Sequence, residues 1–194
     1  MADVSGALPE ALRRQGIDAR LLLPGYPDAL AGLKNARVEA QIEPLLGIGD
    51  AALISGYLPN TNVPVWLIHS PTLYSRKGGL YQDEGGRDWA DNALRFGFLA
   101  HVGAKIARGL IGGWTPDIVH ANDRHAGLLP LLLSLENAAK PATVFTIHNL
   151  AYQGTFPEKR WRPSGFPIAA SIRTASNSMA TFRFRRQLSA IPTS

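Results

Sequence analysis

Two short polar segments follow apolar runs and carry the side chains best suited to chemistry. His148 and Asn149 come directly after the run 143–147, and Asp123 comes shortly after the run 117–120. These residues offer an imidazole, an amide and a carboxylate to a ligand. Titratable side chains that gather in a cleft are candidates for a functional site. The two segments are therefore the first place to look for a site.

The elements around these segments predict that both lie at one edge of a sheet. Residues 143–147 are rich in β-branched and aromatic side chains, which is typical of a buried strand. Leu128–Leu135 is predicted to be a helix, so strand, turn, helix, strand and turn form a βαβ unit. Open α/β sheets bind ligands at the carboxyl ends of their strands. Asp123 has a second possible role, as the N-cap of the following helix.

The rest of the hydrophobic pattern predicts an α/β fold. We expect a mixed-sheet edge near residues 37–69 and a parallel sheet after it. Pro64 marks either the start of a strand or an edge strand. The further predicted elements are a helix at Ala2–Gln15, a strand at Arg20–Leu23, a strand at Val63–His69 and a helix at Asp88–Leu110.

The charge of the chain is distributed unevenly. The chain carries a net charge of +5, yet residues 1–157 hold 13 Lys and Arg against 14 Asp and Glu. Residues 158–194 hold 7 basic residues and 1 acidic residue, so the basic character belongs to this tail. The tail shows no clear helix or strand pattern. Two interpretations stay open: an out-of-frame translation product, or a natural disordered basic tail.

Several classes of function find no support in the sequence. The chain has no Cys, which excludes a disulfide framework and Cys-based metal or redox sites. His120 and His125 flank Asp123 with a spacing that fits no standard metal site. No Gly-x-Ser-x-Gly elbow is present. No apolar run is long enough for a membrane span and no signal peptide is recognised, so we expect a cytoplasmic protein.

Five separated motifs stand out along the chain: ADVSGALP at 2–9, RLLLPGYP at 20–27, LYSRKGGLYQD at 73–83, PDIVHAND at 116–123 and TIHNLAYQG at 146–154. In order and spacing they resemble the N-terminal domain of bacterial glycogen synthase and plant starch synthase. The resemblance runs from Ala2 to about Pro157, so residues 1–157 are interpreted as one truncated domain and residues 158–194 as a non-family tail.

The resemblance implies a partial Rossmann-like domain of a two-domain GT-B glycosyltransferase. In this family a strand and a Lys-Thr-Gly-Gly turn precede the first helix, and a second domain supplies the nucleotide pocket. We expect both to be missing from this chain. The implied reaction transfers glucose from ADP-glucose to the non-reducing end of an α-1,4-glucan with retention, without metal or other cofactor. We therefore predict that the chain alone is inactive.

The resemblance also assigns roles to individual residues. His148 matches a residue that contacts the transferred glucose, and Asp123 matches one that lines the donor and acceptor cleft. Both are predicted to be catalytic. Tyr81 and Asn149 are predicted to bind substrate, although a loop Tyr can equally cover a core. Both neighbours of Asp123 depart from the family: Asn122 stands where His is common, and Arg124 stands where Trp is usual. The loss of an aromatic side chain at position 124 puts acceptor handling in doubt.

Two other functions are weighed against this one. A non-catalytic fragment could bind glucan without turnover. The Arg-rich tail could bind nucleic acid, with a steep dependence on salt. We favour neither, and expect no nucleic acid or membrane partner. The oligomeric state is left open.

Overall fold

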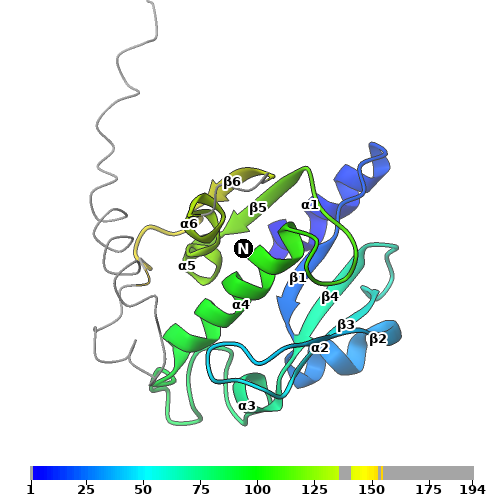
Figure 1. The fold of residues 1–194 in the computed structure, drawn as a ribbon. Coiled ribbons are helices and arrows are strands. Elements are labelled where there is room, and N and C mark those ends of the chain that lie inside the picture. Colours follow the sequence, from blue (N-terminus) through cyan, green and yellow to red (C-terminus); the bar gives the residue numbers. More distant parts are fainter. Residues whose placement is uncertain (1, 136–140, 153, 155–194) are drawn as a thin grey trace, which may run out of the picture.

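The computed structural model describes residues 2–135, 141–152 and 154, in which helices and strands alternate (Figure 1). The predicted boundary at residue 157 and the tail lie outside the described residues. The helices are α1 Ala2–Arg14, α2 Pro27–Gly32, α3 Pro71–Tyr74, α4 Asn92–Ala107, α5 Asp123–Ala126 and α6 Leu129–Ser134. The strands are β1 Leu21–Pro24, β2 Lys34–Ile42, β3 Ala51–Tyr57, β4 Pro64–His69, β5 Ile118–Asn122 and β6 Ala142–Thr146.

The first four strands form a mixed sheet in the order β1-β4-β3-β2. β1 runs parallel to β4, whereas β3 is antiparallel to both β4 and β2. The predicted mixed-sheet character of residues 37–69 is confirmed. Of the two predicted roles of Pro64, the start of a strand is confirmed, because Pro64 is the first residue of β4. The other role is wrong, because β4 is a central strand and not an edge. This is possible because the pairing with β1 begins only at Val65, so no hydrogen bond to β1 is lost.

Gly25 brings the carboxyl end of β1 close to β4. Its N–H donates a 2.9 Å hydrogen bond to the carbonyl oxygen of Ile68. A Cβ atom on Gly25 would lie only 2.8 Å from that oxygen. The absence of a side chain is therefore what allows this approach.

The last two strands, β5 and β6, pair in parallel, as the βαβ pattern predicts. Within the described residues they form a separate two-stranded sheet. The described part of the chain thus has two sheets, which the sequence pattern alone does not indicate. Figure 1 shows α4 between the four-stranded sheet and the β5–α5–α6–β6 unit.

Helix α4 is buried along both sides and joins the two halves. Phe98, Val102 and Ile106 pack with residues of β3 and β4 such as Leu53 and Trp66. The small side chains of α4 instead face the second half, where they pack with α6 and β5. These small residues are Ala100, Ala104 and Ala107. Because apolar residues cover most of its circumference, α4 is a core helix.

The helix is shorter than the predicted Asp88–Leu110. Residues before Asn92 pair back to an earlier loop: the Trp89 N–H donates to the Tyr81 carbonyl oxygen at 3.0 Å, and Asp88 forms an antiparallel bridge with Gln82. These bonds take the place of helical ones, so α4 begins later. None of the described helices combines the length and apolar character that a bilayer span requires.

Candidate functional site

The parallel register of β5 and β6 places the predicted site residues at one edge. The last paired positions are Asn122 and Thr146. Asp123 follows the first of these directly, and His148 follows the second by two residues. Strands that run in parallel end on the same side of a sheet. The structure therefore brings Asp123 and His148 together.

Two hydrogen bonds join the two segments. The backbone N–H of His148 donates to Asp123 Oδ1 at 2.7 Å, and the His148 ring nitrogen Nε2 lies 3.0 Å from Asn122 Oδ1. An amide oxygen can only accept, so Nε2 carries the proton and Nδ1 is left as an acceptor. Sequence reasoning did not foresee Asn122 as a partner of His148. Only the parallel pairing of the strands reveals it.

Asp123 does not act as the predicted N-cap. Helix α5 begins at Asp123 itself, its N-cap residue is Asn122, and no side chain caps it. The Asp123 carboxylate is oriented toward the amide of His148 instead. Its backbone adopts the left-handed region, with φ of 55°. Asp tolerates this conformation better than most residues, because its short polar side chain can hydrogen-bond locally.

Asn149 shapes the turn that follows His148. Its Oδ1 accepts a 2.9 Å hydrogen bond from the Ala151 N–H, and its carbonyl oxygen accepts one from the Tyr152 N–H at 3.3 Å. This is an Asx-type turn, in which an Asn side chain bonds the backbone two residues on. The side chain is exposed, and among the described residues its NH₂ group donates no hydrogen bond. A ligand could use these two donors.

Tyr81 lies in an aromatic cluster beside this edge, formed by Tyr81, Phe96, Arg124, His125 and Tyr152. The rings of Tyr81 and His125 are stacked with centroids 4.7 Å apart, and Phe96 meets His125 edge to face at 4.7 Å. The Arg124 guanidinium lies over Tyr81 at 5.6 Å, Phe96 at 5.9 Å and Tyr152 at 4.9 Å. The cluster connects four segments of the chain: the loop at Tyr81, α4, α5 and the turn at Tyr152.

Burial changes the acid–base properties of the cluster. It lowers the pKa of His125 to about 4, and the positive charge of Arg124 adds to this effect. Both His125 ring nitrogens are buried and have no hydrogen-bond partner among the residues that the structure describes. Burial also raises the pKa of the Tyr81 hydroxyl, against a smaller opposing effect of Arg124. At neutral pH His125 is uncharged and Tyr81 is a phenol.

His125 thus stands apart from His120, as expected. The His120 ring bonds Thr146 Oγ1 at 2.7 Å on β6, whereas His125 packs into the aromatic cluster. No group of three or more metal-ligating side chains occurs in the described part of the chain. Sequence reasoning missed the aromatic cluster. The one sequence signal that could have indicated the cluster is the position of His125, two residues after Asp123.

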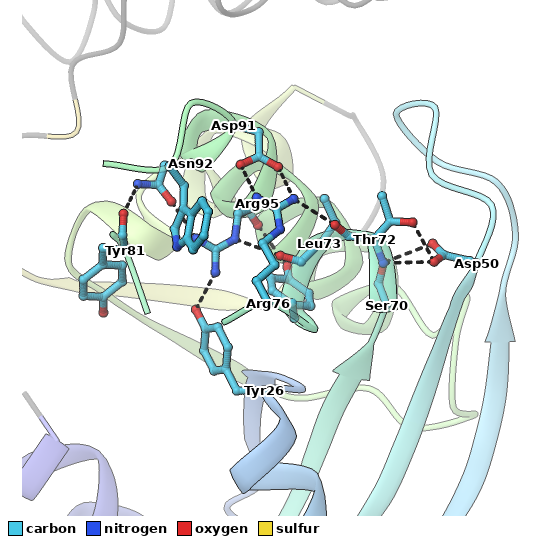
Figure 2. A network of polar contacts seen from close by, with 12 residues as sticks. Tyr26, Asp50, Ser70, Thr72, Leu73, Arg76, Tyr81, Asp91, Asn92 and Arg95 are labelled. Atoms are coloured by element: carbon cyan, nitrogen blue, oxygen red, sulfur yellow. Dashed lines mark hydrogen bonds and ion pairs between the residues drawn. The ribbon is translucent and has the colours of Figure 1, made fainter. Parts of the chain in front are cut away.

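A polar network at the amino end of α4 supports Tyr81 (Figure 2). The Asn92 side chain donates to the Tyr81 carbonyl oxygen at 2.8 Å and accepts from Arg95 Nη1 at 2.7 Å. Arg95 is only 2% exposed; it also donates to the Leu73 carbonyl oxygen at 3.0 Å and to Tyr26 at 3.4 Å. The position of Tyr81 is therefore linked to a buried cation.

Arg76, which is more exposed than Arg95, also forms hydrogen bonds at the amino end of α4. Its guanidinium bonds both carboxylate oxygens of Asp91, the residue before α4, and the carbonyl oxygen of Thr72 (Figure 2). The segment 76–79 forms no helix or strand. The predicted site therefore rests on an ordered support.

A separate polar cavity of about 740 Å³ lies away from this edge and contains none of the predicted site residues. Its lining comes from α1, the start of β2 and the β3–β4 connection: Glu10, Arg13, Lys34, Asn35, Tyr57, Asn60, Thr61 and Asn62. The chemistry-bearing groups predicted from the sequence are thus gathered at the β5–β6 edge. That edge offers a carboxylate, an imidazole and amides next to aromatic faces, a combination suited to a polyhydroxylated ligand.

Comparison with known proteins yields a consistent set of similarities. The family described as the starch synthase catalytic domain matches residues 1–192. A glycogen synthase of Paramagnetospirillum magneticum is 49% identical over 170 residues, and one of Nitrosomonas eutropha is 47% identical over 171. Each alignment covers 86% of this chain and 34% of the relative, so the chain spans about a third of the length of these curated relatives.

A solved structure is similar as well. It is the catalytic domain of starch synthase IV from Arabidopsis thaliana, bound to ADP and acarbose, with a TM-score of 0.63 and 23% sequence identity. The similarity covers 87% of this chain and 34% of that chain. At this identity the likeness establishes a shared fold.

Proposed function

Since this chain belongs to the starch synthase catalytic domain family, we propose that its β5–β6 edge forms one wall of a glucosyl-transfer cleft. The α/β fold predicted for the N-terminal part of a GT-B glycosyltransferase is confirmed. The proposed reaction moves glucose from ADP-glucose to the non-reducing end of an α-1,4-glucan with retention. The single observation that carries the proposal is the contact between Asp123 and His148 at this edge.

Asp123 is proposed to stabilise positive charge. One carboxylate oxygen accepts the His148 N–H, whereas Oδ2 accepts no hydrogen bond within the described residues. A fixed carboxylate oxygen favours the positive charge that develops at an anomeric carbon, most strongly where water is excluded. The bond to His148 fixes its direction in advance. Asp123 thus acts through electrostatics and needs no proton transfer.

His148 is proposed to hold the transferred sugar. Its backbone is held by Asp123 and its ring by Asn122, so the imidazole has little freedom to rotate. Nδ1 remains as an acceptor for a sugar hydroxyl group. Such positioning lowers the entropic cost of reaching the reactive geometry. This role agrees with catalysis by positioning.

Tyr81 and Asn149 are proposed to bind substrate next to this pair. The Asn149 amide has two available donors, and Tyr81 offers a hydroxyl and part of an aromatic face, both suited to carbohydrate. The independence of the reaction from metals and other cofactors stays a prediction. So does the cytoplasmic location of the protein.

Ligand binding to the 194-residue chain tests the proposal. We expect ADP-glucose and maltohexaose to shift the backbone amide signals of Asp123 and His148 in two-dimensional NMR titrations. His148→Ala should weaken both ligands by about tenfold, in line with one hydrogen bond to a sugar. Arg37→Gln is the control, because Arg37 is paired with Glu39 on β2, away from the site. Unchanged Asp123 and His148 signals with both ligands would contradict the proposal.

Turnover is a separate question. For the 194-residue chain we expect no incorporation of radiolabelled glucose from ADP-glucose into glycogen, because a single wall cannot exclude water from the reacting groups. Incorporation above the blank would refute this expectation.

A further inference from the structure

Among the described residues, Arg124 has no anionic partner within ion-pair distance at the proposed site. The ion pairs of the described residues involve other arginines. Within the same residues the buried Nε of Arg124 has no hydrogen-bond partner. Leaving a charged donor buried and unpaired is costly in free energy. An anionic ligand would remove this cost.

The guanidinium is held in place without such a partner. It lies over the rings of Tyr81, Phe96 and Tyr152 at 4.9 to 5.9 Å. At the base of the side chain, a Cβ added to Gly154 would lie 2.8 Å from Arg124 Cβ, so Gly154 packs closely against the aliphatic start of this side chain. Aromatic faces attract a guanidinium through its plane and leave the N–H groups at its rim for other acceptors.

The position of Arg124 connects it to the proposed chemistry. Its neighbour Asp123 contacts His148, and Tyr152 follows the turn that Asn149 forms. The side chain is partly exposed, so a ligand at the edge can reach it. A guanidinium matches the oxygens of a phosphate group in geometry and charge, whereas a neutral sugar would leave its charge unpaired.

We propose that Arg124 binds a phosphate group carried by the glucosyl ligand at the Asp123–His148 edge. This proposal rests on the proposed function and adds the class of ligand to it. The phosphate has two possible sources: the diphosphate of the nucleotide-sugar donor, or a phosphate ester on the sugar that occupies the other position. Both offer the same anionic oxygens to the guanidinium.

The test follows Arg124 itself and three ligands. In the 194-residue chain, the ¹⁵N signal of the Arg124 Nε–H reports directly on this group. We expect glucose 1-phosphate or ADP-glucose to shift it saturably, and maltose to leave it unchanged. Arg124→Trp should lower the affinity for the phosphate ligand by at least tenfold and the affinity for maltose by less than twofold. Arg124→Lys, which keeps the charge and loses the planar fork, should fall between Arg124→Trp and the unmodified chain.

The outcomes separate the alternatives. Dependence on Arg124 for ADP-glucose alone shows that the diphosphate of the donor is required, and dependence for glucose 1-phosphate as well shows that a sugar monophosphate is sufficient; both support the proposal. Phosphate affinity that Arg124→Trp leaves within twofold overturns it, and so does an Nε–H signal that no phosphate ligand shifts. The Nε–H signal is measured in the unmodified chain, so this test remains valid even where a variant fails to fold. Arg37→Gln again serves as the control for loss of one positive charge.

The two proposals can fail independently. Loss of maltohexaose binding at Asp123 and His148 would contradict the proposed function, while a saturable shift of the Arg124 signal by inorganic phosphate would leave an anion site standing. Conversely, maltohexaose could bind at the edge while no phosphate ligand shifts the Arg124 Nε–H signal. This result would support the proposed function and contradict the proposed phosphate site.

Discussion

The backbone N–H of His148 donates a 2.7 Å hydrogen bond to Asp123 Oδ1, across 25 positions of sequence. The carboxylate therefore ties the turn after β6 to the turn after β5. Because the same Asp123 has a left-handed backbone with φ of 55°, the contact depends on both its side chain and its main chain. Substitutions at this position can separate the two contributions.

We expect Asp123→Asn to change the free energy of unfolding by less than about 0.5 kcal/mol, because Asn keeps an acceptor and tolerates φ above zero. Asp123→Gly can adopt the left-handed backbone conformation but loses the hydrogen bond to the His148 N–H. Asp123→Ala loses this hydrogen bond and also disfavours the left-handed conformation. We expect Ala to cost about 2 kcal/mol and Gly to fall between Ala and Asn. Urea denaturation gives the order, and hydrogen exchange at the His148 amide should accelerate in the Gly and Ala variants. An Ala variant as stable as Asn would contradict this account.

The neutral His125 makes the fold sensitive to acid. Its pKa is about 4 in the folded chain, below the ordinary value of 6.5, because of burial and the charge of Arg124. The unfolded chain therefore binds more protons between these values, so stability is fully present above pH 6.5 and falls as the pH drops toward 4. Since the ring keeps some contact with solvent, we expect a loss of about 1 kcal/mol between pH 7 and pH 5.

His125→Phe keeps a ring on Tyr81 and removes the titration, so the loss between pH 7 and pH 5 should shrink in thermal melts. Burial also lowers the pKa of His101, which acts in the same direction. The double variant with His101→Leu should therefore show a smaller pH dependence than either single variant. A slope that His125→Phe leaves unchanged would show that this ring is not the acid-sensitive group.

Arg95 supports the site through its buried network and should be among the costliest residues to replace. Arg95→Ala removes three hydrogen bonds and the side chain packed between Tyr26 and Tyr74, and leaves the Leu73 carbonyl oxygen unpaired. We expect a loss of about 3 kcal/mol in the free energy of unfolding. Urea unfolding monitored by circular dichroism measures it.

Arg76→Ala is the matched control, since it also removes an arginine from this network but a more exposed one, 25% accessible in its side chain. We expect a cost of about 1 kcal/mol. Equal costs for the two variants would contradict the importance given to burial. Arg95→Lys should stay close to Arg95→Ala, because an ammonium cannot reach the three acceptors at once.

Gly25 tests the close approach of β1 and β4. Gly25→Ala would place a Cβ 2.8 Å from the Ile68 carbonyl oxygen, so we expect a loss of about 2 kcal/mol as the strands move apart. Gly6→Ala in α1 is the contrasting substitution, since its Cβ would meet nothing within 4 Å. There Ala should stabilise by about 0.5 to 1 kcal/mol, because it favours the helix. Thermal melts of the two variants should shift in opposite directions.

Much of the fold could be predicted, because its elements have strong periodicity. Apolar residues about one turn apart, such as Phe98, Val102 and Ile106, are typical of a helix, and these three lie in the core of α4. The β-branched runs identified β5 and β6 and hence the shared edge of Asp123 and His148. The expectation that residues 143–147 form a buried strand was wrong, because β6 is exposed along most of its length in the described structure. Asp123 looked like an N-cap, but a hydrogen bond from a distant amide competes successfully for its carboxylate.

The aromatic cluster could not be predicted, because its members come from separate segments. Tyr81 lies in a loop, Phe96 in α4 and His125 in α5, and no periodicity relates them. The sequence identified Arg124 only as a departure from a family pattern. Its role as the centre of three aromatic contacts emerges from tertiary packing. Buried polar groups such as Arg95 are equally invisible to hydrophobic patterns.

The division into two sheets has a consequence for handling the protein. Within the described residues, β1 pairs only with β4, and β5 pairs only with β6, so each presents a row of backbone groups along one unpaired edge. Apolar side chains accompany the second edge, with Ile118 61% exposed. Such strands are templates for intermolecular β-pairing. Concentration should therefore govern the solution behaviour of this chain, with self-association starting at these two strands.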